Sequence, residues 1–442
     1  MYSKIGVVGL GYVGLTLTAV LAERGFRVCG VDADPGVLAS LNRGRVHLYE
    51  PGVERILAEH LGRSITLAAE LDPDVDAVIL CVSTPVDPVT RRPDLANLAA
   101  AAAGVARRCA PGTLVVVRST VPVGASRRIV LPPLAAAGGE VRLVMAPERT
   151  IQGQALRELV ELPQVVGGVD EAARAAGREL FAGVAEQVVE VSSLEAAELI
   201  KLSNNCPTDL IYAFGNEIAL IAERHGLDPL EVIAGANLGY PRPDLARPGY
   251  VGGGCLSKDP YLMVESAGQE PPFLVGAARQ LNEYVPGHVA EMVVELLDQE
   301  LGTAAGARLA VLGWAYKGRP ATDDMRGTPI DAMLGVFQAA GVTVLGHDPL
   351  VRPETIRRHG GEPVSLDDAC SGADAVLLLT DHGDYRGLTA DRLTGVAVVV
   401  DSWRILDEHA LAAAGIRYAG LGYLPPRPAG TRPRRQPTAV FS

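Results

Sequence analysis

Cys255 is the side chain with the clearest chemical use in this sequence. It lies in the run Arg-Pro-Gly-Tyr-Val-Gly-Gly-Gly-Cys-Leu-Ser-Lys-Asp, which spans residues 247–259. The glycines before the cysteine let the backbone fold closely around a ligand and present N–H groups to it. Lys258 and Asp259 follow within one helical turn, and a nearby ammonium favours the reactive thiolate. The run therefore predicts a nucleophilic cysteine in a ligand-binding loop, although a Gly-rich turn beside a small buried cysteine fits the same residues.

A second group of polar residues has helical spacing. Lys201, Asn205 and Asp209 follow one another at intervals of four residues, which places them on one face of a helix. Their neighbours along the chain are apolar, so we expect part of this face to be buried, as in the wall of an active site. A solvated charged face is the alternative. Pro207 lies inside this stretch and removes one helical N–H, which predicts a kink.

The N-terminus carries a dinucleotide-binding pattern, Gly9-Leu10-Gly11-Tyr12-Val13-Gly14, between an apolar run and a helical pattern. Gly9 suits a tight turn, Gly11 lets a pyrophosphate approach the backbone, and Gly14 allows close packing of helix on strand. Asp32 ends the next apolar run, where a carboxylate binds the ribose diol of NAD and repels the 2′-phosphate of NADP. These features predict an NAD site, with a purely structural glycine turn as the alternative.

Polar loops follow three further apolar runs in this half of the chain. They are Ser83-Thr84-Pro85, Ser119-Thr120-Val121 and Glu148-Arg149. In open α/β sheets ligands bind beyond the carboxyl ends of the strands, where hydroxyl groups can meet ribose and nicotinamide and a carboxylate can orient a catalytic water. Helix capping by the hydroxyls and an exposed loop charge at Glu148 are the structural alternatives.

Short apolar runs alternate with helical patterns in both halves of the chain. The predicted strands are Lys4–Val8, Arg27–Val31, Ala77–Val82, Leu114–Val117, Arg142–Met145, Gln164–Gly167, Leu309–Leu312, Thr343–Leu345, Ala375–Leu379 and Val396–Val400. Such alternation is typical of parallel sheets, and long helical patterns fill the interval between the halves. We therefore expect an α/β fold with two Rossmann-like doubly wound domains, 1–193 and 302–424, joined by a central helical domain, 194–301. A Pro- and Arg-rich tail, 425–442, is predicted to be disordered.

The composition excludes several classes of protein. With 40 basic and 52 acidic residues among 442, the net charge is −12, which disfavours a nucleic-acid-binding surface. The six cysteines form no CxxC pair and the eight histidines have no metal-ligand spacing, so we expect reduced thiols and no metal. A strand pattern begins within the first residues and no apolar run approaches about 18 residues, so we expect neither a signal peptide nor a membrane span. These features predict a soluble, cytoplasmic protein.

Taken together, the motifs resemble the nucleotide-sugar dehydrogenases, a family that includes UDP-glucose, GDP-mannose and UDP-N-acetylmannosamine 6-dehydrogenases. The resemblance runs in order from about residue 3 to residue 405. Its motifs are the glycine turn, Cys81–Pro85, Arg118–Gly124, Pro147–Thr150, Ala196–Asn205, Gly252–Tyr261 and Lys317 with Thr322–Arg326. Pro147–Leu159 and Ile211–Glu217 look most like the N-acetylhexosamine branch. One departure is Thr208, where that branch commonly has Arg, which leaves the sugar open.

The resemblance implies a four-electron oxidation in which a sugar CH2OH becomes a carboxylate and two NAD are reduced. It assigns a covalent thiohemiacetal and then a thioester to Cys255, proton transfer to Lys201 and Asp259, oxyanion binding to Asn205 and Lys201, and water positioning to Glu148 and Thr120. The implied cofactor contacts are Gly9, Gly11, Tyr12, Val13, Gly14, Asp32, Thr84, Ser119, Thr120 and Lys258. The implied substrate contacts are Glu148, Arg149, Lys201, Asn205, Arg242, Tyr250, Gly252, Gly253, Lys317 and Arg326.

The resemblance also implies a homodimer through the central helices, with a nucleotide sugar as the small-molecule partner. The turn Gly313-Trp314-Ala315-Tyr316-Lys317-Gly318 lacks the GxGxxG spacing, so we expect the nucleotide of the sugar in the second Rossmann-like domain and no second dinucleotide. We expect a UDP-N-acetylhexosamine of the N-acetylmannosamine type as substrate. UDP-glucose or GDP-mannose, a single-step NAD dehydrogenase that needs no cysteine, and a non-catalytic nucleotide-sugar binder are the alternatives.

Overall fold

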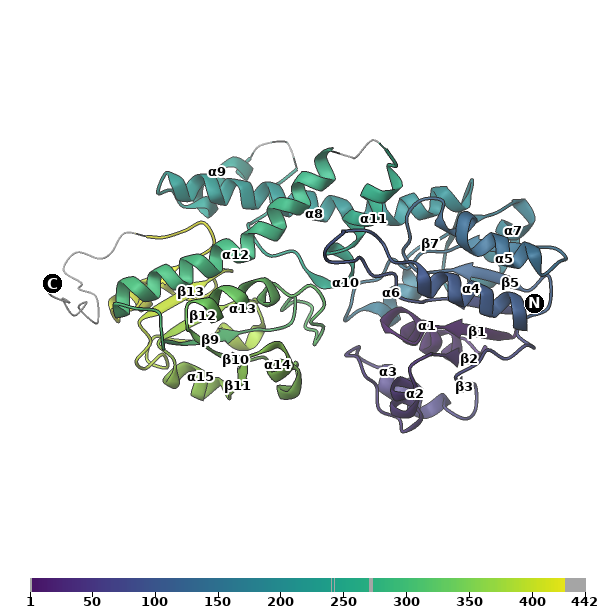
Figure 1. Ribbon diagram of the computed structural model, residues 1–442, viewed down its shortest axis with the longest axis horizontal. Helices are drawn as coiled ribbons and strands as arrows, with labels where there is room; N and C mark the ends of the chain where they lie inside the picture. The colour runs from purple at the N-terminus through teal and green to yellow at the C-terminus, as the bar shows by residue number, and fades with distance from the viewer. Residues whose placement is uncertain (1, 240, 242, 270–272, 426–442) are drawn as a thin grey trace. The chain divides into compact units, whose positions relative to one another are not determined.

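The computed structural model describes residues 2–239, 241, 243–269 and 273–425. Two compact units make up the chain (Figure 1). The first contains Met1–Cys206 and Lys258–Pro272, and the second contains Pro207–Ser257 and Phe273–Ser442. Arg242 and residues 426–442 lie outside the described residues, so the predicted substrate contact and the predicted disordered tail stay predictions.

The first unit is built on an eight-stranded sheet in the order β3-β2-β1-β4-β5-β6-β7-β8. Its strands are β1 (Lys4–Val8), β2 (Arg27–Val31), β3 (Ile65–Ala68), β4 (Ala77–Leu80), β5 (Leu114–Val117), β6 (Arg142–Met145), β7 (Gln164–Gly168) and β8 (Val188–Val191). All neighbours are parallel except β6 and β7, which pair antiparallel. The predicted doubly wound α/β fold is confirmed, with that one pair as a departure from a fully parallel sheet.

Helices cover both faces of this sheet. Ile79 and Val116 pack with residues of α1 (Tyr12–Glu23), α3 (Val53–His60) and α7 (Glu171–Ala182), whereas Val78, Val115 and Val117 pack with α4 (Ala96–Arg108). Adjacent strand residues therefore enter opposite cores, which is why these strands are continuous apolar runs. The other elements of the unit are α2 (Pro35–Asn42), the π-helical turn η1 (Ser126–Val130), α5 (Leu131–Ala136), α6 (Ala155–Glu161) and α11 (Asp259–Ser266).

Two long helices occupy the middle of the sequence. Helix α8 spans Leu194–Arg224 and lies within the predicted central helical region, 194–301. It continues through Pro207, the residue at which the chain passes from the first unit to the second. Helix α12 spans Phe273–Leu301 and belongs to the second unit, as do α9 (Pro229–Asn237) and the short α10 (Gly253–Leu256). The kink at Pro207 stays a prediction.

The second unit contains a six-stranded, fully parallel sheet in the order β11-β10-β9-β12-β13-β14. Its strands are β9 (Arg308–Leu312), β10 (Thr343–His347), β11 (Glu362–Pro363), β12 (Ala375–Leu378), β13 (Val398–Asp401) and β14 (Arg417–Ala419). Residues of α12 and α13 (Ile330–Ala339) share one core with this sheet. Residues of α15 (Leu366–Gly372) and α16 (Glu408–Ala413) share the other. Helix α14 (Pro353–His359) and the 3-10 turn η2 (Gly383–Tyr385) complete the unit, whose layers are visible in Figure 1.

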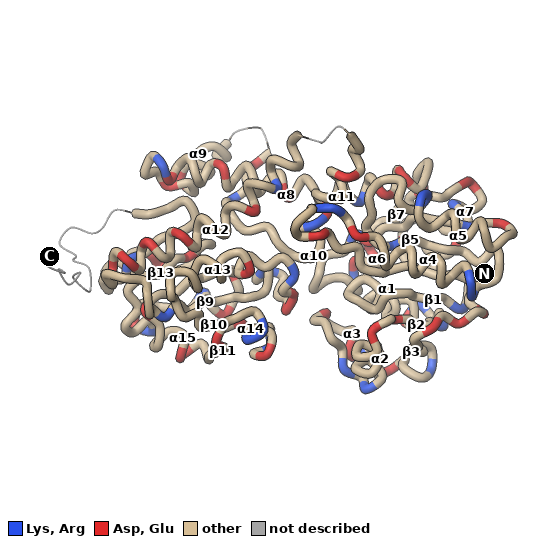
Figure 2. Tube along the Cα trace, viewed as in Figure 1, with Lys and Arg blue, Asp and Glu red and all other residues tan. Residues whose placement is uncertain are grey.

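Acidic and basic residues are interspersed along the chain in both units (Figure 2). Among the described residues, no helix is long and apolar enough to cross a membrane. Within the same residues, no cluster of His, Cys, Asp and Glu is arranged to hold a metal ion.

Candidate active site

The glycine turn between β1 and α1 has the geometry of a phosphate cradle. Gly9 has φ +93°, and a Cβ there would lie 2.8 Å from the Cys81 carbonyl oxygen. A Cβ on Gly14 would lie 1.8 Å from the Gly9 carbonyl oxygen, so this position cannot carry a side chain without opening the turn. A Cβ on Gly11 would meet no atom within 4 Å, and no side chain caps the helix that starts at Tyr12. The open side of the turn therefore fits a pyrophosphate beside the helix N-terminus.

Asp32 is fixed next to this turn at the end of β2. Its Oδ2 accepts the Leu10 N–H at 2.7 Å, and its Oδ1 accepts the Asp34 N–H at 2.9 Å. A carboxylate oxygen has more than one lone pair, so both oxygens can accept a further hydrogen bond. The residues of the turn and Asp32 therefore fit the pyrophosphate and ribose of NAD.

Tyr12 contacts a buried acid that the sequence motifs did not indicate. Its hydroxyl donates to the Glu50 carboxylate, which also accepts the Gly153 N–H at 2.6 Å and the Ala155 N–H at 2.9 Å. Burial and the hydrogen bond to Glu50 raise the pKa of Tyr12, so its hydroxyl stays protonated as a donor. Glu50 thus connects the cofactor turn to the start of α6.

The polar loops after β4 and β5 meet, as expected at the carboxyl ends of neighbouring strands. The Thr84 hydroxyl donates to the Thr120 carbonyl at 2.7 Å, and the Ser119 hydroxyl donates to the Val82 carbonyl at 2.6 Å. The Lys258 ammonium donates to the Thr84 hydroxyl at 3.3 Å. The structure therefore brings together four of the predicted cofactor contacts, on two strand ends and at the start of α11.

Glu148 forms a buried ion pair with Arg118. The guanidinium donates to Glu148 Oε2 from Nε at 3.1 Å and from Nη2 at 2.6 Å, and its Nη1 donates to Gln164 Oε1 at 2.9 Å. Glu148 Oε1 accepts the N–H groups of Arg149 and Thr150. Burial alone would raise the pKa of Glu148, but the charge of Arg118 and these hydrogen bonds lower it, so the carboxyl is ionised. The role of Glu148 in positioning a water stays a prediction, because the contacts just described are also those of a residue that only fixes the loop after β6.

The first half of α8 helps to hold Asp259 in place. Asn205 Nδ2 donates to Asp259 Oδ2 at 2.5 Å, and the Lys258 ammonium donates to Asp259 Oδ1 at 2.9 Å. Three predicted site residues thus form one cluster around a fully buried carboxylate. Lys201 lies one turn before Asn205 and is also buried.

Glu198, on the same helix, is a further buried acid that sequence reasoning missed. Its carboxylate accepts the Gly124 N–H at 2.5 Å and the Ser126 N–H at 2.9 Å. Burial raises its pKa, against the effect of these hydrogen bonds. Glu198 therefore joins the loop after β5 to the helix turn that carries Lys201. Arg149 adds a contact from the loop after β6, because its Nη2 lies 3.4 Å from Asn204 Oδ1.

The remaining predicted residues belong to the second unit. Cys255 is exposed on α10, in the middle of the Gly-rich segment. The Gly253 N–H donates to the Arg326 carbonyl at 2.8 Å. A Cβ on Gly252 would lie 2.3 Å from the Gly327 carbonyl oxygen, and one on Gly253 would lie 2.8 Å from the Tyr316 ring. The backbone of Gly327 at Gly252 and the Tyr316 ring at Gly253 therefore leave no room for a side chain at these two positions.

Arg326 is a cation beside the segment that carries Cys255, because its guanidinium carbon would lie 2.6 Å from a Cβ on Gly254. Its guanidinium forms a fork with Asp324, with Nε to Oδ1 at 3.0 Å and Nη2 to Oδ2 at 2.7 Å. This hydrogen bonding with Asp324 is the main reason why the pKa of Arg326 is raised. Lys317 Nζ lies 5.4 Å from the Tyr316 ring centroid, and the buried Tyr250 hydroxyl pairs with Ser402 Oγ at 2.9 Å.

Asp209 differs from the other two polar residues of α8. Its carboxylate pairs with Arg279 of α12 at 2.6 Å, within the second unit. Lys201 and Asn205 belong to the first unit, and the shared polar face expected from the helical spacing stays a prediction.

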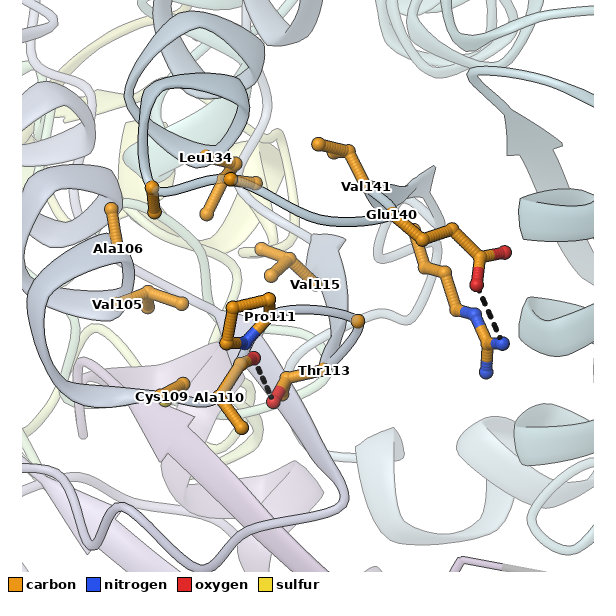
Figure 3. Close-up of a pocket in the computed structure, with 14 residues that line it drawn as sticks. Val105, Ala106, Cys109, Ala110, Pro111, Thr113, Val115, Leu134, Glu140 and Val141 are labelled. Carbon is orange, nitrogen blue, oxygen red and sulfur yellow. Dashed lines mark hydrogen bonds and ion pairs between the residues drawn. The ribbon is translucent and has the colours of Figure 1, made fainter.

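A small cavity lies elsewhere in the first unit (Figure 3). Val105, Cys109, Pro111, Leu134 and Val141 line it, and its volume is about 30 Å³. Ligand pockets are larger, roughly 300–1,000 Å³. Pro111 and Val141 come just before β5 and β6, so the cavity lies at the amino ends of strands whose carboxyl ends carry the predicted site. Burial also raises the pKa of Cys109 to about 11, which disfavours a reactive thiolate there.

The largely parallel sheet, the glycine turn and Asp32 define an NAD-binding protein of the Rossmann type. Three family models match the chain in sequence order. They describe an NAD binding domain at residues 3–185, a central domain at 195–284 and a UDP binding domain at 310–408. The chain belongs to the UDP-glucose/GDP-mannose dehydrogenase family, and it is an NAD-dependent nucleotide-sugar dehydrogenase.

Similar proteins match the chain over nearly its whole length. The UDP-N-acetyl-D-mannosamine dehydrogenase of Pyrococcus horikoshii is 32% identical over 430 residues, which is 95% of this chain and 99% of the relative. The NDP-N-acetyl-D-galactosaminuronic acid dehydrogenase of Ralstonia nicotianae is 32% identical over 426 residues, covering 93% and 98%. The solved structure of the Pyrococcus horikoshii UDP-D-ManNAc dehydrogenase has a TM-score of 0.85 at 30% identity and covers 95% of this chain and 99% of that one. These matches confirm the family and the cofactor expected from the sequence.

Proposed function

We propose that the enzyme oxidises C6 of a UDP-N-acetylhexosamine of the N-acetylmannosamine type to the carboxylate, with Cys255 as covalent nucleophile. The observation that carries this proposal is the exposed Cys255 on a short helix beside Arg326, whose guanidinium carbon would lie 2.6 Å from a Cβ on Gly254. A nearby cation favours the thiolate, which is the nucleophilic form. The choice of sugar rests on the relatives named as UDP-N-acetyl-D-mannosamine dehydrogenases.

In the first oxidation Lys201 and Asp259, acting through water, receive the proton of the C6 hydroxyl. NAD, held by the glycine turn and Asp32, supplies the hydride acceptor for both oxidations. The Cys255 thiolate then adds to the aldehyde carbon. A C–S bond forms, the C=O π bond breaks, and the oxygen takes up a proton to give a thiohemiacetal. Covalent capture keeps the aldehyde in the site until it is oxidised again.

Oxidation of the thiohemiacetal gives a thioester, and its hydroxyl proton leaves to solvent through the same residues. Water then adds to the thioester carbonyl, the C–S bond breaks, and the Cys255 thiolate is released. Asn205 and Lys201 donate hydrogen bonds to the oxyanion that develops in these steps. Glu148 and Thr120 position the water. One sugar nucleotide, two NAD and one water thus give one uronate, two NADH and three protons.

Lys317 and Arg326 would bind the diphosphate and the sugar, as a point charge and a planar fork respectively. Arg149, Tyr250, Gly252 and Gly253 would complete the sugar-nucleotide site, with Arg242 as a further contact. We also propose the three domains expected from the sequence, 1–193, 194–301 and 302–424, and a cytoplasmic location, where NAD and nucleotide sugars are available.

A homodimer through α8 is part of the same proposal. Ile211, Phe214 and Ile221 have 52%, 53% and 51% of their surface exposed. Their spacing of three and seven residues places them on one face of the helix. An apolar stripe of this kind suits a two-fold interface, in which the same face of each copy meets its equivalent.

The test is the stoichiometry of purified enzyme with NAD and a panel of UDP-N-acetylmannosamine, UDP-N-acetylgalactosamine, UDP-glucose and GDP-mannose. We expect two NADH per sugar oxidised, and the highest kcat/KM with a UDP-N-acetylhexosamine. A ratio of one NADH per sugar would identify a single-step dehydrogenase. NAD and sugar binding without turnover on any substrate would identify a non-catalytic binder, and preference for UDP-glucose or GDP-mannose would reject the proposed sugar.

A further inference from the structure

A buried chain of polar side chains connects α8 to α12 in the second unit. Arg279 Nη1 donates to Asp209 Oδ1 at 2.6 Å, and Asn282 Nδ2 donates to the same oxygen at 2.9 Å and to the Asp209 carbonyl at 2.8 Å. Asn216 Nδ2 donates to Asn282 Oδ1 at 2.9 Å. Each of these four side chains is at most 3% exposed. We name them the buried network.

The buried network holds both ends of the segment that carries Cys255. At one end Asn216 forms two hydrogen bonds with Gly249, accepting its N–H at 2.9 Å and donating to its carbonyl at 3.0 Å. At the other end Arg279 Nη1 donates to the Leu256 carbonyl at 3.1 Å. Leu256 directly follows Cys255, so the Arg279 guanidinium binds the backbone one residue away from the proposed nucleophile.

Fold stability alone gives a weak reason for such a network. Burial opposes the ionised form of Asp209 and raises its pKa, against the attraction of Arg279. Apolar residues of similar size often replace buried ion pairs without loss of stability. Buried polar groups do, however, fix one arrangement of the backbone, because their hydrogen bonds are directional. Here the backbone that they fix is residues 249–256.

We propose that the buried network positions the Cys255 thiol for capture of the aldehyde. Arg279 is the positioning residue next to the cysteine, and Asp209 and Asn282 hold Arg279 in place. Asn216 holds the other end of the segment, at Gly249. This inference rests on the proposed function, because it assumes that Cys255 is the nucleophile. The network touches no reacting atom. It acts by holding the Leu256 carbonyl and Gly249, and so the short helix between them.

The consequence is specific to the step that uses the thiol. When the segment is not held, the first oxidation still produces one aldehyde and one NADH, but the C–S bond forms more slowly. The aldehyde then leaves the site before the second oxidation. A displacement of about 1 Å between reacting groups can lower a rate by about 100-fold.

The experiment compares the double variant Asp209→Leu/Arg279→Met with wild type, Arg279→Lys and Glu223→Gln. The double variant replaces the buried pair with apolar residues, so the fold is retained and checked by thermal unfolding. Arg279→Lys keeps a cation that can donate to Asp209 and the Leu256 carbonyl. Glu223→Gln is the matched control, because Glu223 pairs with His288 between the same two helices and contacts no residue of the segment 249–256 in any hydrogen bond described here.

The assays measure kcat, KM for the nucleotide sugar, and free aldehyde trapped as an oxime with O-benzylhydroxylamine. For the double variant we expect the kcat of uronate formation to fall by about 100-fold, a KM within about threefold of wild type, and oxime formed at one NADH per molecule. Arg279→Lys should recover most of the loss, and Glu223→Gln should behave as wild type. A folded double variant with wild-type kcat and no oxime overturns the inference, as does loss of activity without released aldehyde. One NADH per sugar in the wild type would instead reject the proposed function itself.

Discussion

Replacement of Arg118 by Met tests whether the interior of the first unit depends on the ion pair with Glu148. The Arg118 and Glu148 side chains are only 1% and 8% exposed, so removal of the guanidinium leaves a carboxylate buried without its main counter-charge. The two backbone N–H groups of Arg149 and Thr150 remain as its hydrogen-bond donors. The Gln164 amide oxygen and the Ala146 carbonyl lose a donor as well.

Breaking a buried ion pair by removing one partner destabilises proteins by about 3–5 kcal/mol. For a cooperative unit of roughly 200 residues, each kcal/mol lowers the melting temperature by about 2–4 °C. The expected loss for Arg118→Met is therefore on the order of 6–20 °C. The double variant Arg118→Met/Glu148→Leu removes both charges, so it should recover most of this loss, because no unpaired charge is left.

The assay is thermal unfolding followed by circular dichroism and calorimetry, in the absence of NAD, for the wild type, both single variants and the double variant. A double-mutant cycle then gives the coupling between the two side chains. A fall of less than about 1 kcal/mol for Arg118→Met, or a double variant as unstable as the worse single variant, would refute the reasoning.

Three further predictions follow from single contacts. Gly14→Ala should lower both the free energy of unfolding without ligand and the free energy of NAD binding by about 1–3 kcal/mol each, because its Cβ would lie 1.8 Å from the Gly9 carbonyl oxygen. Gly11→Ala should weaken NAD binding alone, and equal melting temperatures for the two variants would contradict this. The hydrogen bond with Glu223 raises the pKa of His288 above its usual value of 6.5. Protonated His288 therefore stabilises the fold below pH 6.5, and this contribution is lost as the pH rises through the pKa of the folded state. The difference in unfolding free energy between wild type and Glu223→Gln, measured by urea unfolding, should shrink from pH 6 to pH 9. Phe214→Arg should convert the proposed dimer to a monomer in light scattering after size-exclusion chromatography, and a mass unchanged from wild type would exclude this face as the interface.

Much of the fold is readable from local sequence pattern. The strands with two covered faces, such as β4 and β5, are continuous apolar runs, and the glycine turn is defined by positions where a side chain would collide with backbone. The edge strands escaped prediction for a physical reason. Strand β8 reads Val-Val-Glu-Val with partly and fully exposed residues, and β11 has only two residues. Neither segment therefore shows the continuous or alternating apolar pattern that predicts a strand.

The buried polar pairs could not be predicted, because the two partners lie far apart in the sequence. Glu148 is 30 residues from Arg118, and Arg279 is 70 residues from Asp209. In the sequence alone, each of these four charged residues could equally be a solvent-exposed residue on the surface. Glu198 stands in a recognised motif, but only the folded loop brings the Gly124 and Ser126 N–H groups to its carboxylate. The resemblance of motifs predicted Cys255 as the nucleophile, whereas the residues that contact its segment could be found only from the structure.

The most direct test of the covalent mechanism is to observe the acyl group on sulfur. Enzyme, NAD and UDP-N-acetylmannosamine are mixed, quenched with acid within milliseconds, and the peptides analysed by mass spectrometry. We predict a transient thioester on the peptide that contains Cys255, which rises with the second NADH, decays as the uronate forms, and is missing in Cys255→Ala. Full production of uronate and two NADH with no adduct at Cys255 at any time, or with the adduct on another cysteine, would contradict the mechanism.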